Sequence, residues 1–232
     1  MKNEKKILSK EVISWAFYDW ANSAFATTVI AGFFPIFFKS FWANSLSDSE
    51  STALLGVANS LSGFFILIFA PFLGALADIT FRKKYMLVFF MLIGAGSTAS
   101  FFFINEGYWM IAVITYILAS IGFSGGNIFY DSLIIDVSND QSRNKVSAFG
   151  YAMGYLGGGI LFVVNVLMYL QPNTFGLTSQ IDAVLFSFLS VAIWWSVFTL
   201  PLIRFVKESK GEITSLSLIS TLNNSKKKLD RS

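Results

Sequence analysis

Residues 15–38 read WAFYDWANSAFATTVIAGFFPIFF, and this stretch decides the fold. It is longer than the roughly 20 apolar residues that a helix needs to cross a hydrocarbon core about 30 Å thick. Asp19, Asn22 and Ser23 lie inside it, although a carboxylate within a membrane is energetically expensive and usually serves a function. The stretch therefore predicts a membrane-spanning helix that carries a polar site.

The composition of the whole chain indicates a membrane protein. Hydrophobic residues make up 54% of the 232 residues and charged residues only 13%, about half of the usual charged share of about 25%. Lipid offers no hydrogen bonds to the backbone, and the apolar runs are too long and too uniform for tilted barrel strands. We therefore expect an all-α bundle with six transmembrane helices. The apolar stretches lie at about 15–38, 54–77, 85–104, 108–131, 146–170 and 183–206.

The distribution of basic residues between these stretches predicts the orientation. All of the 17 Lys and Arg residues except Lys39 fall on one side of the expected membrane, and Lys and Arg accumulate on the cytoplasmic side. Both termini are therefore expected in the cytoplasm, in a multi-pass protein of a cell (inner) membrane. We predict a cytoplasmic tail over 1–14, a six-helix bundle over 15–206, and a basic cytoplasmic tail or truncated central linker over 207–232.

Composition also excludes several classes of function. The basic residues are divided among loops, so no nucleic-acid-binding face is expected. The absence of Cys and His removes thiolate and imidazole metal ligands and the usual proton carrier near neutral pH. No phosphate-binding Gly-x-x-x-x-Gly-Lys-Ser/Thr loop occurs in the sequence. We therefore expect no metal, no cofactor and no ATP-driven pump.

A short motif on the fourth helix suggests one class of enzyme. GFSGG at 122–126 fits Gly-x-Ser-x-Gly and lies on the fourth of six helices, where rhomboid intramembrane proteases carry their nucleophile. A serine nucleophile needs a base such as His to take its proton, and the chain has no His. We therefore interpret Ser124 as part of a polar helix face and do not expect an enzyme.

Two helices carry polar residues on one face. On the fourth helix these residues are spaced four, four, three and four apart, which places them on one side at 3.6 residues per turn. Helices one and four are the first members of two three-helix units, as expected for an inverted repeat around a central cavity. No Lys, Arg or His lies within the apolar runs to neutralise the carboxylates, so we predict that both faces bind substrate or protons. For Asp131, near its helix end, a position in the wet interface or a capping role is equally open. The predicted site residues are Asp19, Asn22 and Ser23 on the first helix and Tyr116, Ser120, Ser124, Asn127 and Asp131 on the fourth.

The loop between the second and third helices reads GALADITFRKKYML, starting at Gly74. It resembles the cytoplasmic-loop signature of the major facilitator superfamily (MFS), Gly-x-x-x-Asp-x-x-x-Arg-Arg/Lys, with Gly74, Asp78, Arg82 and Lys83 in the matching places. Charges at such a junction can form an ion pair that holds one transporter state. We predict that Arg82 or Lys83 pairs with Asp136 when the cytoplasmic side is closed. A plain basic loop on the cytoplasmic side is the alternative.

The fifth helix contains GYAMGYLGGG, in which Gly150, Gly154 and Gly158 recur every four residues and share one face. Such small residues let a neighbouring helix approach closely in a membrane. The glycines therefore indicate close helix packing or a moving hinge, and both interpretations stay open.

Four segments together resemble the vacuole-effluxer branch of the MFS, which is known from autophagy-related amino-acid efflux. They are YDWANSAFAT at 18–27, FYDSLIIDV at 129–137, GYAMGYLGGG at 150–159 and WWSVFTLPL at 194–202. The resemblance implies a secondary-active transporter that works by alternating access, with a small-molecule substrate such as an amino acid and the proton gradient as one source of energy. It also implies twelve helices, arranged as two six-helix halves around the substrate site.

Three interpretations follow from a chain with six helices. In the first, it is the N-terminal half of an MFS fold, and a second six-helix half on a separate chain covers its polar faces. In the second, a second copy of the same chain provides that cover. In the third, it is a membrane fragment or scaffold that pairs with another membrane subunit and transports nothing. We favour the first, because two copies would place Asp19 against Asp19 with no cation between them.

Overall fold

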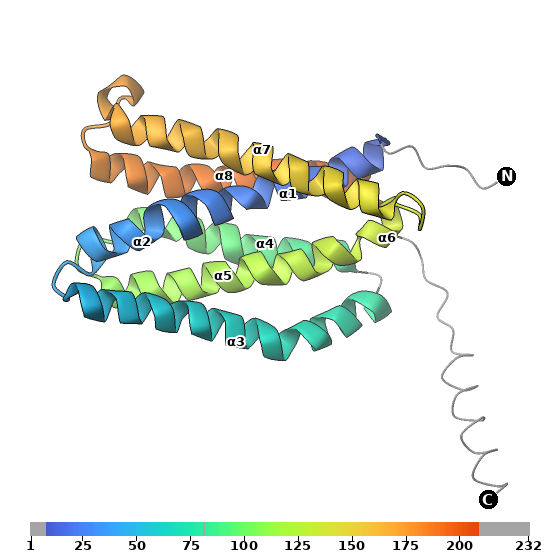
Figure 1. The fold of residues 1–232 in the computed structure, drawn as a ribbon, viewed down its shortest axis with the longest axis horizontal. Helices are drawn as coiled ribbons and strands as arrows, with labels where there is room; N and C mark the ends of the chain where they lie inside the picture. The colour runs from blue at the N-terminus through green and yellow to red at the C-terminus, as the bar shows by residue number, and fades with distance from the viewer. Residues whose placement is uncertain (1–7, 81, 209–232) are drawn as a thin grey trace, which may run out of the picture.

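The protein is a bundle of long helices (Figure 1). The structure, a computed structural model, describes residues 8–80 and 82–208, and the side chains of 78–80 are not described. Within this part of the chain, six segments are long and apolar enough to cross a membrane, as predicted. They are Lys10–Trp42, Asp48–Ala77, Lys83–Phe103, Trp109–Val137, Arg143–Leu170 and Gln180–Phe205.

Each segment contains one long α-helix, and some contain short irregular turns. The α-helices are α1 (Lys10–Ala24), α2 (Phe34–Phe37), α3 (Asp48–Thr80), α4 (Lys83–Ser100), α5 (Trp109–Ser132), α6 (Ile134–Val137), α7 (Arg143–Leu170) and α8 (Gln180–Phe205). The π-helices are η1 (Phe25–Phe33) and η2 (Phe38–Trp42), and the 3₁₀ turns are η3 (Phe101–Phe103) and η4 (Pro172–Phe175).

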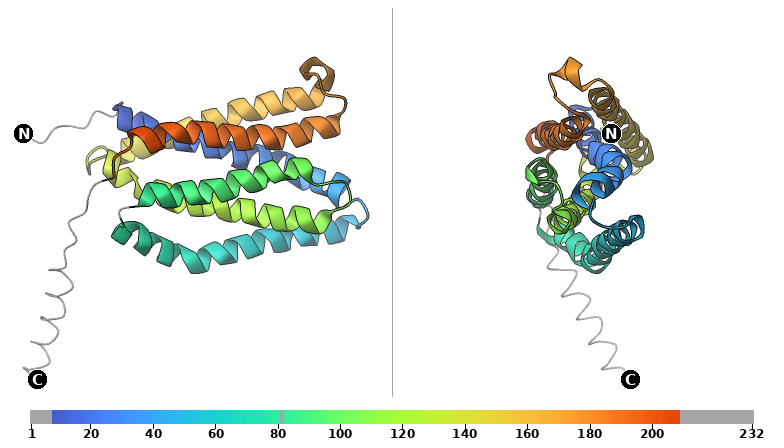
Figure 2. Two further views of the ribbon diagram at one scale, coloured as in Figure 1. Left: turned by 180° about the vertical axis from the view of Figure 1, so that it is seen from behind. Right: turned by 90° about the vertical axis from the view of Figure 1, so that its left-hand side faces the viewer.

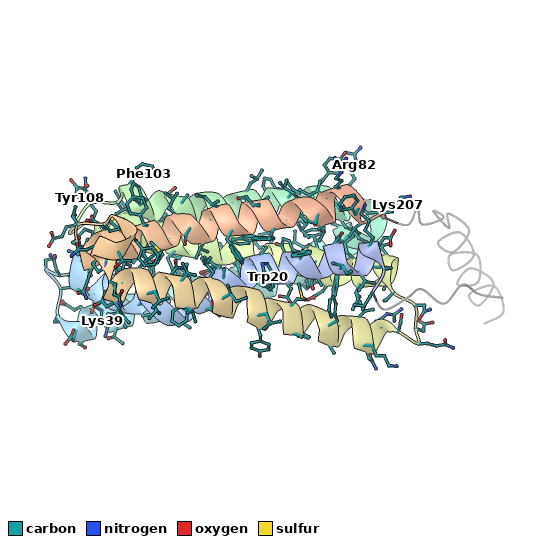
Figure 3. The ribbon with its side chains drawn as sticks, turned by 90° about the horizontal axis from the view of Figure 1, so that it is seen from above. Trp20, Lys39, Arg82, Phe103, Tyr108 and Lys207 are labelled. Carbon is teal, nitrogen blue, oxygen red and sulfur yellow. The ribbon has the colours of Figure 1, made fainter. Side chains whose placement is uncertain are left out.

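The first helix begins earlier than the sequence predicts. α1 starts at Lys10, because the hydroxyl of Ser9 accepts a hydrogen bond from the N–H of Val12 at 3.3 Å and caps the helix. The expected boundary at residue 15 marks only where the apolar run begins. α1 starts and α8 ends at the same end of the bundle, as an even number of spans requires (Figure 1). Figure 3 shows Arg82 and Lys207 at this end and Lys39 at the other, so we call it the basic end.

The helices pack in a pattern that repeats between the two halves of the chain. α1 packs against α7 and α8, whereas α5 packs against α3 and α4. The first helix of each three-helix unit therefore contacts the second and third helices of the other unit. Seen along the helices, α1 lies in the middle of the bundle and α3 lies at its edge (Figure 2). This reciprocal packing brings the two predicted polar faces, on α1 and α5, into one region.

The first span is not the regular helix that its composition suggests. The backbone is π-helical over Phe25–Phe33 and again over Phe38–Trp42. Pro35 lies between these segments; it has no N–H to donate and disfavours regular α-helical bonding. The hydroxyl of Thr27 donates to the carbonyl oxygens of Ser23 at 3.0 Å and Gly158 at 3.2 Å. The π-helical turns, which are frequent at functional sites, begin directly after the polar residues of α1.

Aromatic rings fill the end of the bundle opposite the basic end. Phe34 stacks on Tyr116 with ring centroids 4.2 Å apart, and Trp42 lies 5.3 Å from Phe101. The indole N–H of Trp42 donates to the carbonyl oxygen of Ile104 at 3.1 Å. Because these rings come from the first, third and fourth spans, they hold this end of the bundle together.

Candidate functional site

The polar faces of α1 and α5 meet through a hydrogen bond. The side-chain amide nitrogen of Asn22 donates to the amide oxygen of Asn127 at 2.5 Å. Asn22 is fully buried and Asn127 is partly buried. Side-chain hydrogen bonds between membrane helices contribute about 0.6 kcal/mol on average. This bond joins the first helices of the two three-helix units through residues of the two predicted polar faces.

Asp19 lies one helical turn before Ser23 on the same face of α1. The Ser23 hydroxyl donates to Oδ1 of Asp19 at 3.2 Å. Asp19 is only partly buried. The ion pairs found among the described side chains join Lys83 to Asp136 and Arg143 to Asp140, so neither neutralises Asp19. A carboxylate with a single hydroxyl partner retains acceptor capacity for a ligand.

The glycines of α7 allow that helix to approach the carboxylate. A Cβ atom on Gly154 would lie 2.9 Å from Cγ of Asp19 and 2.7 Å from Oγ of Ser23. One on Gly150 would lie 2.7 Å from the Trp15 ring, and one on Gly158 would lie 2.9 Å from the Ser23 carbonyl oxygen. The close helix contact expected for the three glycines is therefore present. The hinge interpretation stays a prediction.

Aromatic side chains surround the same region, and they are not among the site residues predicted from the sequence. Trp15 stacks on Tyr130 with centroids 4.4 Å apart and planes 9° apart, and its indole N–H donates to the Tyr130 carbonyl oxygen at 3.0 Å. The Tyr18 ring centroid lies 5.3 Å from that of Tyr130. One feature of the sequence does point to Trp15, because it precedes Asp19 by one turn on the same face of α1. Tyr130 is buried, although the next residue, Asp131, is exposed. The sequence places Tyr130 beside Asp131 but does not show that Tyr130 is buried.

The polar face of α5 is divided between two environments. Asn127 reaches α1, whereas Tyr116 is buried among aromatic rings and donates its hydroxyl to Oδ1 of Asn59 on α3 at 2.8 Å. Ser120 is buried and Ser124 is partly buried. The structure therefore brings Asn127 to the polar residues of α1, and it places Tyr116 in the helix packing against α3. The spacing of these residues predicted that they share one face of the helix. It did not show that only part of this face lies at the site.

The ion pair predicted at the basic end forms through Lys83. Its ammonium nitrogen lies 3.1 Å from Oδ2 of Asp136 and also donates to the carbonyl oxygen of Ser132 at 3.1 Å. The Lys83 and Asp136 side chains are 7% and 1% exposed, so the pair is buried. Arg82, the other candidate cation, is exposed at the start of α4. A Cβ on Gly74 would meet nothing within 4 Å, and the Asp78 side chain lies outside the described part.

Comparisons with known proteins show the family to which the chain belongs. A model of the family of vacuole effluxer Atg22-like proteins matches residues 46–230. The chain belongs to the vacuole effluxer Atg22-like family. YxiO of Bacillus subtilis (strain 168), an uncharacterised MFS-type transporter, is 38% identical over 205 residues, which cover 88% of this chain and 48% of YxiO. Autophagy-related protein 22 of Eremothecium gossypii is 20% identical over 84% of this chain and 46% of its own length.

A solved structure shows the same fold. The crystal structure of a D-xylose–proton symporter matches 96% of this chain with a TM-score of 0.59 and 20% sequence identity. The match covers 52% of the symporter, and this chain spans about half the length of the curated relatives it matches. The predicted MFS fold is therefore confirmed, and the Atg22-like chain is an integral, multi-pass membrane protein.

Proposed function

We propose that this Atg22-like chain forms one six-helix half of a secondary-active transporter that moves a small solute by alternating access. The observation that carries the proposal is the Asn22–Asn127 hydrogen bond, which joins the polar faces of α1 and α5 next to Asp19. Transporter sites of this kind lie at repeat interfaces, where polar helix faces converge. Membership of a family described as vacuole effluxers supports transport as the activity.

The chemistry of the site favours a substrate with a protonated amine. Asp19 lies in this region, and Asp131 follows Tyr130 on α5. The rings of Trp15 and Tyr130 stack on each other in the same region. Carboxylates and aromatic faces both attract cations. Amino acids carry such an ammonium group, so we propose amino-acid efflux, with Asp19 accepting either the ammonium group or a coupling proton. In this account the basic end faces the cytoplasm of a cell whose inner membrane holds the protein.

The proposed partner is a second six-helix half. In the most apolar 18 residues of the span that contains α3, only 11% are buried within the bundle. In the corresponding residues of the other spans, 28% to 44% are buried. A Cβ added to Gly56 or Gly63 of α3 would meet nothing within 4 Å, so a helix could approach this face closely. A second copy of the chain is the alternative partner, and a scaffold without transport is the alternative function.

Flux from reconstituted protein separates these possibilities. The chain is placed in liposomes alone, and also together with the unmatched half of YxiO, and uptake of labelled amino acids is measured. Saturable uptake that requires the second half supports the proposal. Uptake by the chain alone would indicate a homodimer, and no uptake in either arrangement, with both proteins folded, would indicate a scaffold.

A further inference from the structure

The N-terminus of α4 is capped by a residue from the far end of the chain. Oε2 and Oε1 of Glu208 accept hydrogen bonds from the backbone N–H groups of Lys83 and Lys84, both at 3.0 Å. The preceding residue, Arg82, gives no side-chain cap. The first N–H groups of a helix have no partner within the helix, and negative charge is favourable there. Glu208 therefore supplies the cap that local sequence does not.

The C-terminus of α8 is capped in return by α4. The ammonium group of Lys84 donates to the carbonyl oxygen of Val206 at 2.7 Å and to that of Ile203 at 3.3 Å. These carbonyls belong to the end of α8, where a positive charge is favourable. The two helices thus cap each other at the basic end, through Glu208 in one direction and Lys84 in the other.

Lys83 connects this reciprocal cap to the buried ion pair. Its backbone N–H is held by Glu208, while its ammonium group is held by Asp136 and by the carbonyl oxygen of Ser132. One residue therefore links the end of α8, the start of α4 and the α5–α6 segment. Because Lys83 is buried and its backbone is fixed at one point, a shift of the first turn of α4 also moves the ammonium group.

We propose that Glu208 is a positioning residue for the Lys83–Asp136 ion pair. By holding the first turn of α4, it keeps the Lys83 ammonium group within reach of Asp136. The segment that leaves α8 is thereby coupled to the ion pair, so a displacement of Glu208 weakens the pair without touching Asp136. This coupling does not require the proposed substrate or any transport.

Two control residues lie at the same end of the bundle. Lys207 is adjacent to Glu208 and exposed, so Lys207→Ala removes a charged side chain outside the reciprocal cap. Asp140 forms an exposed ion pair with Arg143 at 2.7 Å, so Asp140→Asn breaks a different ion pair. Glu208→Gln keeps one acceptor oxygen and provides an intermediate variant.

The first measurement is hydrogen–deuterium exchange of the chain in lipid nanodiscs. Glu208→Ala is expected to accelerate exchange of the Lys83 and Lys84 amides about tenfold or more, since hydrogen bonds to charged groups are strong. Glu208→Gln should give a smaller change and Lys207→Ala none. Unchanged exchange at these amides in Glu208→Ala would overturn the cap.

The second measurement is a double-mutant cycle on the thermal unfolding temperature. Glu208→Ala and Asp136→Asn should give a combined shift clearly smaller than the sum of their separate shifts, because both act through Lys83. Glu208→Ala and Asp140→Asn should be additive. Additive shifts in the first pair would show that Glu208 only stabilises the helix end and would overturn its role in positioning Lys83.

Discussion

Within residues 8–80 and 82–208, Asp19 accepts a hydrogen bond from the Ser23 hydroxyl, and the α7 residue that packs against its carboxylate is Gly154. A carboxylate at this depth is costly unless it is paired, protonated or used. Gly154 lets the backbone of α7 approach the carboxylate, which keeps acceptor capacity beyond its bond to Ser23. At the scale of single residues, the site is therefore made as much by the glycine as by the carboxylate.

Asp19→Asn is expected to reduce amino-acid flux at least about tenfold in liposomes that also contain the second half. The change is nearly isosteric and removes the charge, and a hydrogen bond to a charged group contributes about 1.5–3 kcal/mol. The amount of folded protein in the membrane, measured by gel filtration after extraction in detergent, should stay equal to that of wild type. Asp182→Asn is the control and should leave flux unchanged, because Asp182 is a partly buried residue in the first turn of α8, at the end of the bundle opposite the basic end. An equal loss of folded protein in Asp19→Asn would indicate a structural role instead.

Gly154→Ala is expected to lower the thermal stability, because the new Cβ would lie 2.9 Å from the Asp19 carboxylate. Overpacking typically costs about 1–3 kcal/mol, and Gly154→Leu should cost more. Gly159→Ala on the same helix is the matched control, since a Cβ there meets nothing within 4 Å. The unfolding temperature in detergent checks both. A stable Gly154→Ala protein would contradict the close contact and leave only flexibility as the role of this glycine.

At the scale of elements, the number and approximate positions of the helices were predictable because each apolar run must cross the same hydrocarbon thickness. The polar faces on α1 and α5 were predictable from helical spacing. The π-helical turns over Phe25–Phe33 were not, and the bond that Thr27 of this segment donates to the carbonyl oxygen of Gly158 comes from packing against another helix. The Glu208 cap was not predictable either, because its partners lie far away in the sequence.

The buried ion pair at the basic end gives a prediction at this scale. Asp136→Asn leaves the buried Lys83 ammonium group without its counter-charge, and breaking a buried pair costs about 3–5 kcal/mol. Asp140→Asn breaks an exposed pair, which contributes about 0–1 kcal/mol. The unfolding temperature of the first variant should therefore fall well below that of the second. Equal unfolding temperatures would show that the ion pair does not hold α4 to the α5–α6 segment.

At the scale of the whole molecule, the two three-helix units interlock around α1 and α5, and α3 remains the most exposed span. The family comparison covers about half the length of each relative. Both findings support the proposal that this bundle packs against a second six-helix half. The sequence alone could indicate the two polar faces, but only their reciprocal packing shows that Asn22 and Asn127 touch.

If Asp19, Asn22, Ser23 and Asn127 line the proposed substrate site, water and water-soluble reagents must reach them, and thiol accessibility measures this. The chain has no cysteine, so Ser23→Cys introduces a single reporter. Ser196→Cys on α8, also partly buried but on a face lined by Leu92 and Val197, is the control. In liposomes that contain both halves, we expect a water-soluble maleimide to label Ser23→Cys and not Ser196→Cys, and we expect an added mixture of amino acids to slow the labelling. Absence of labelling at Ser23→Cys, or labelling that no amino acid slows, would show that these residues do not line a substrate site.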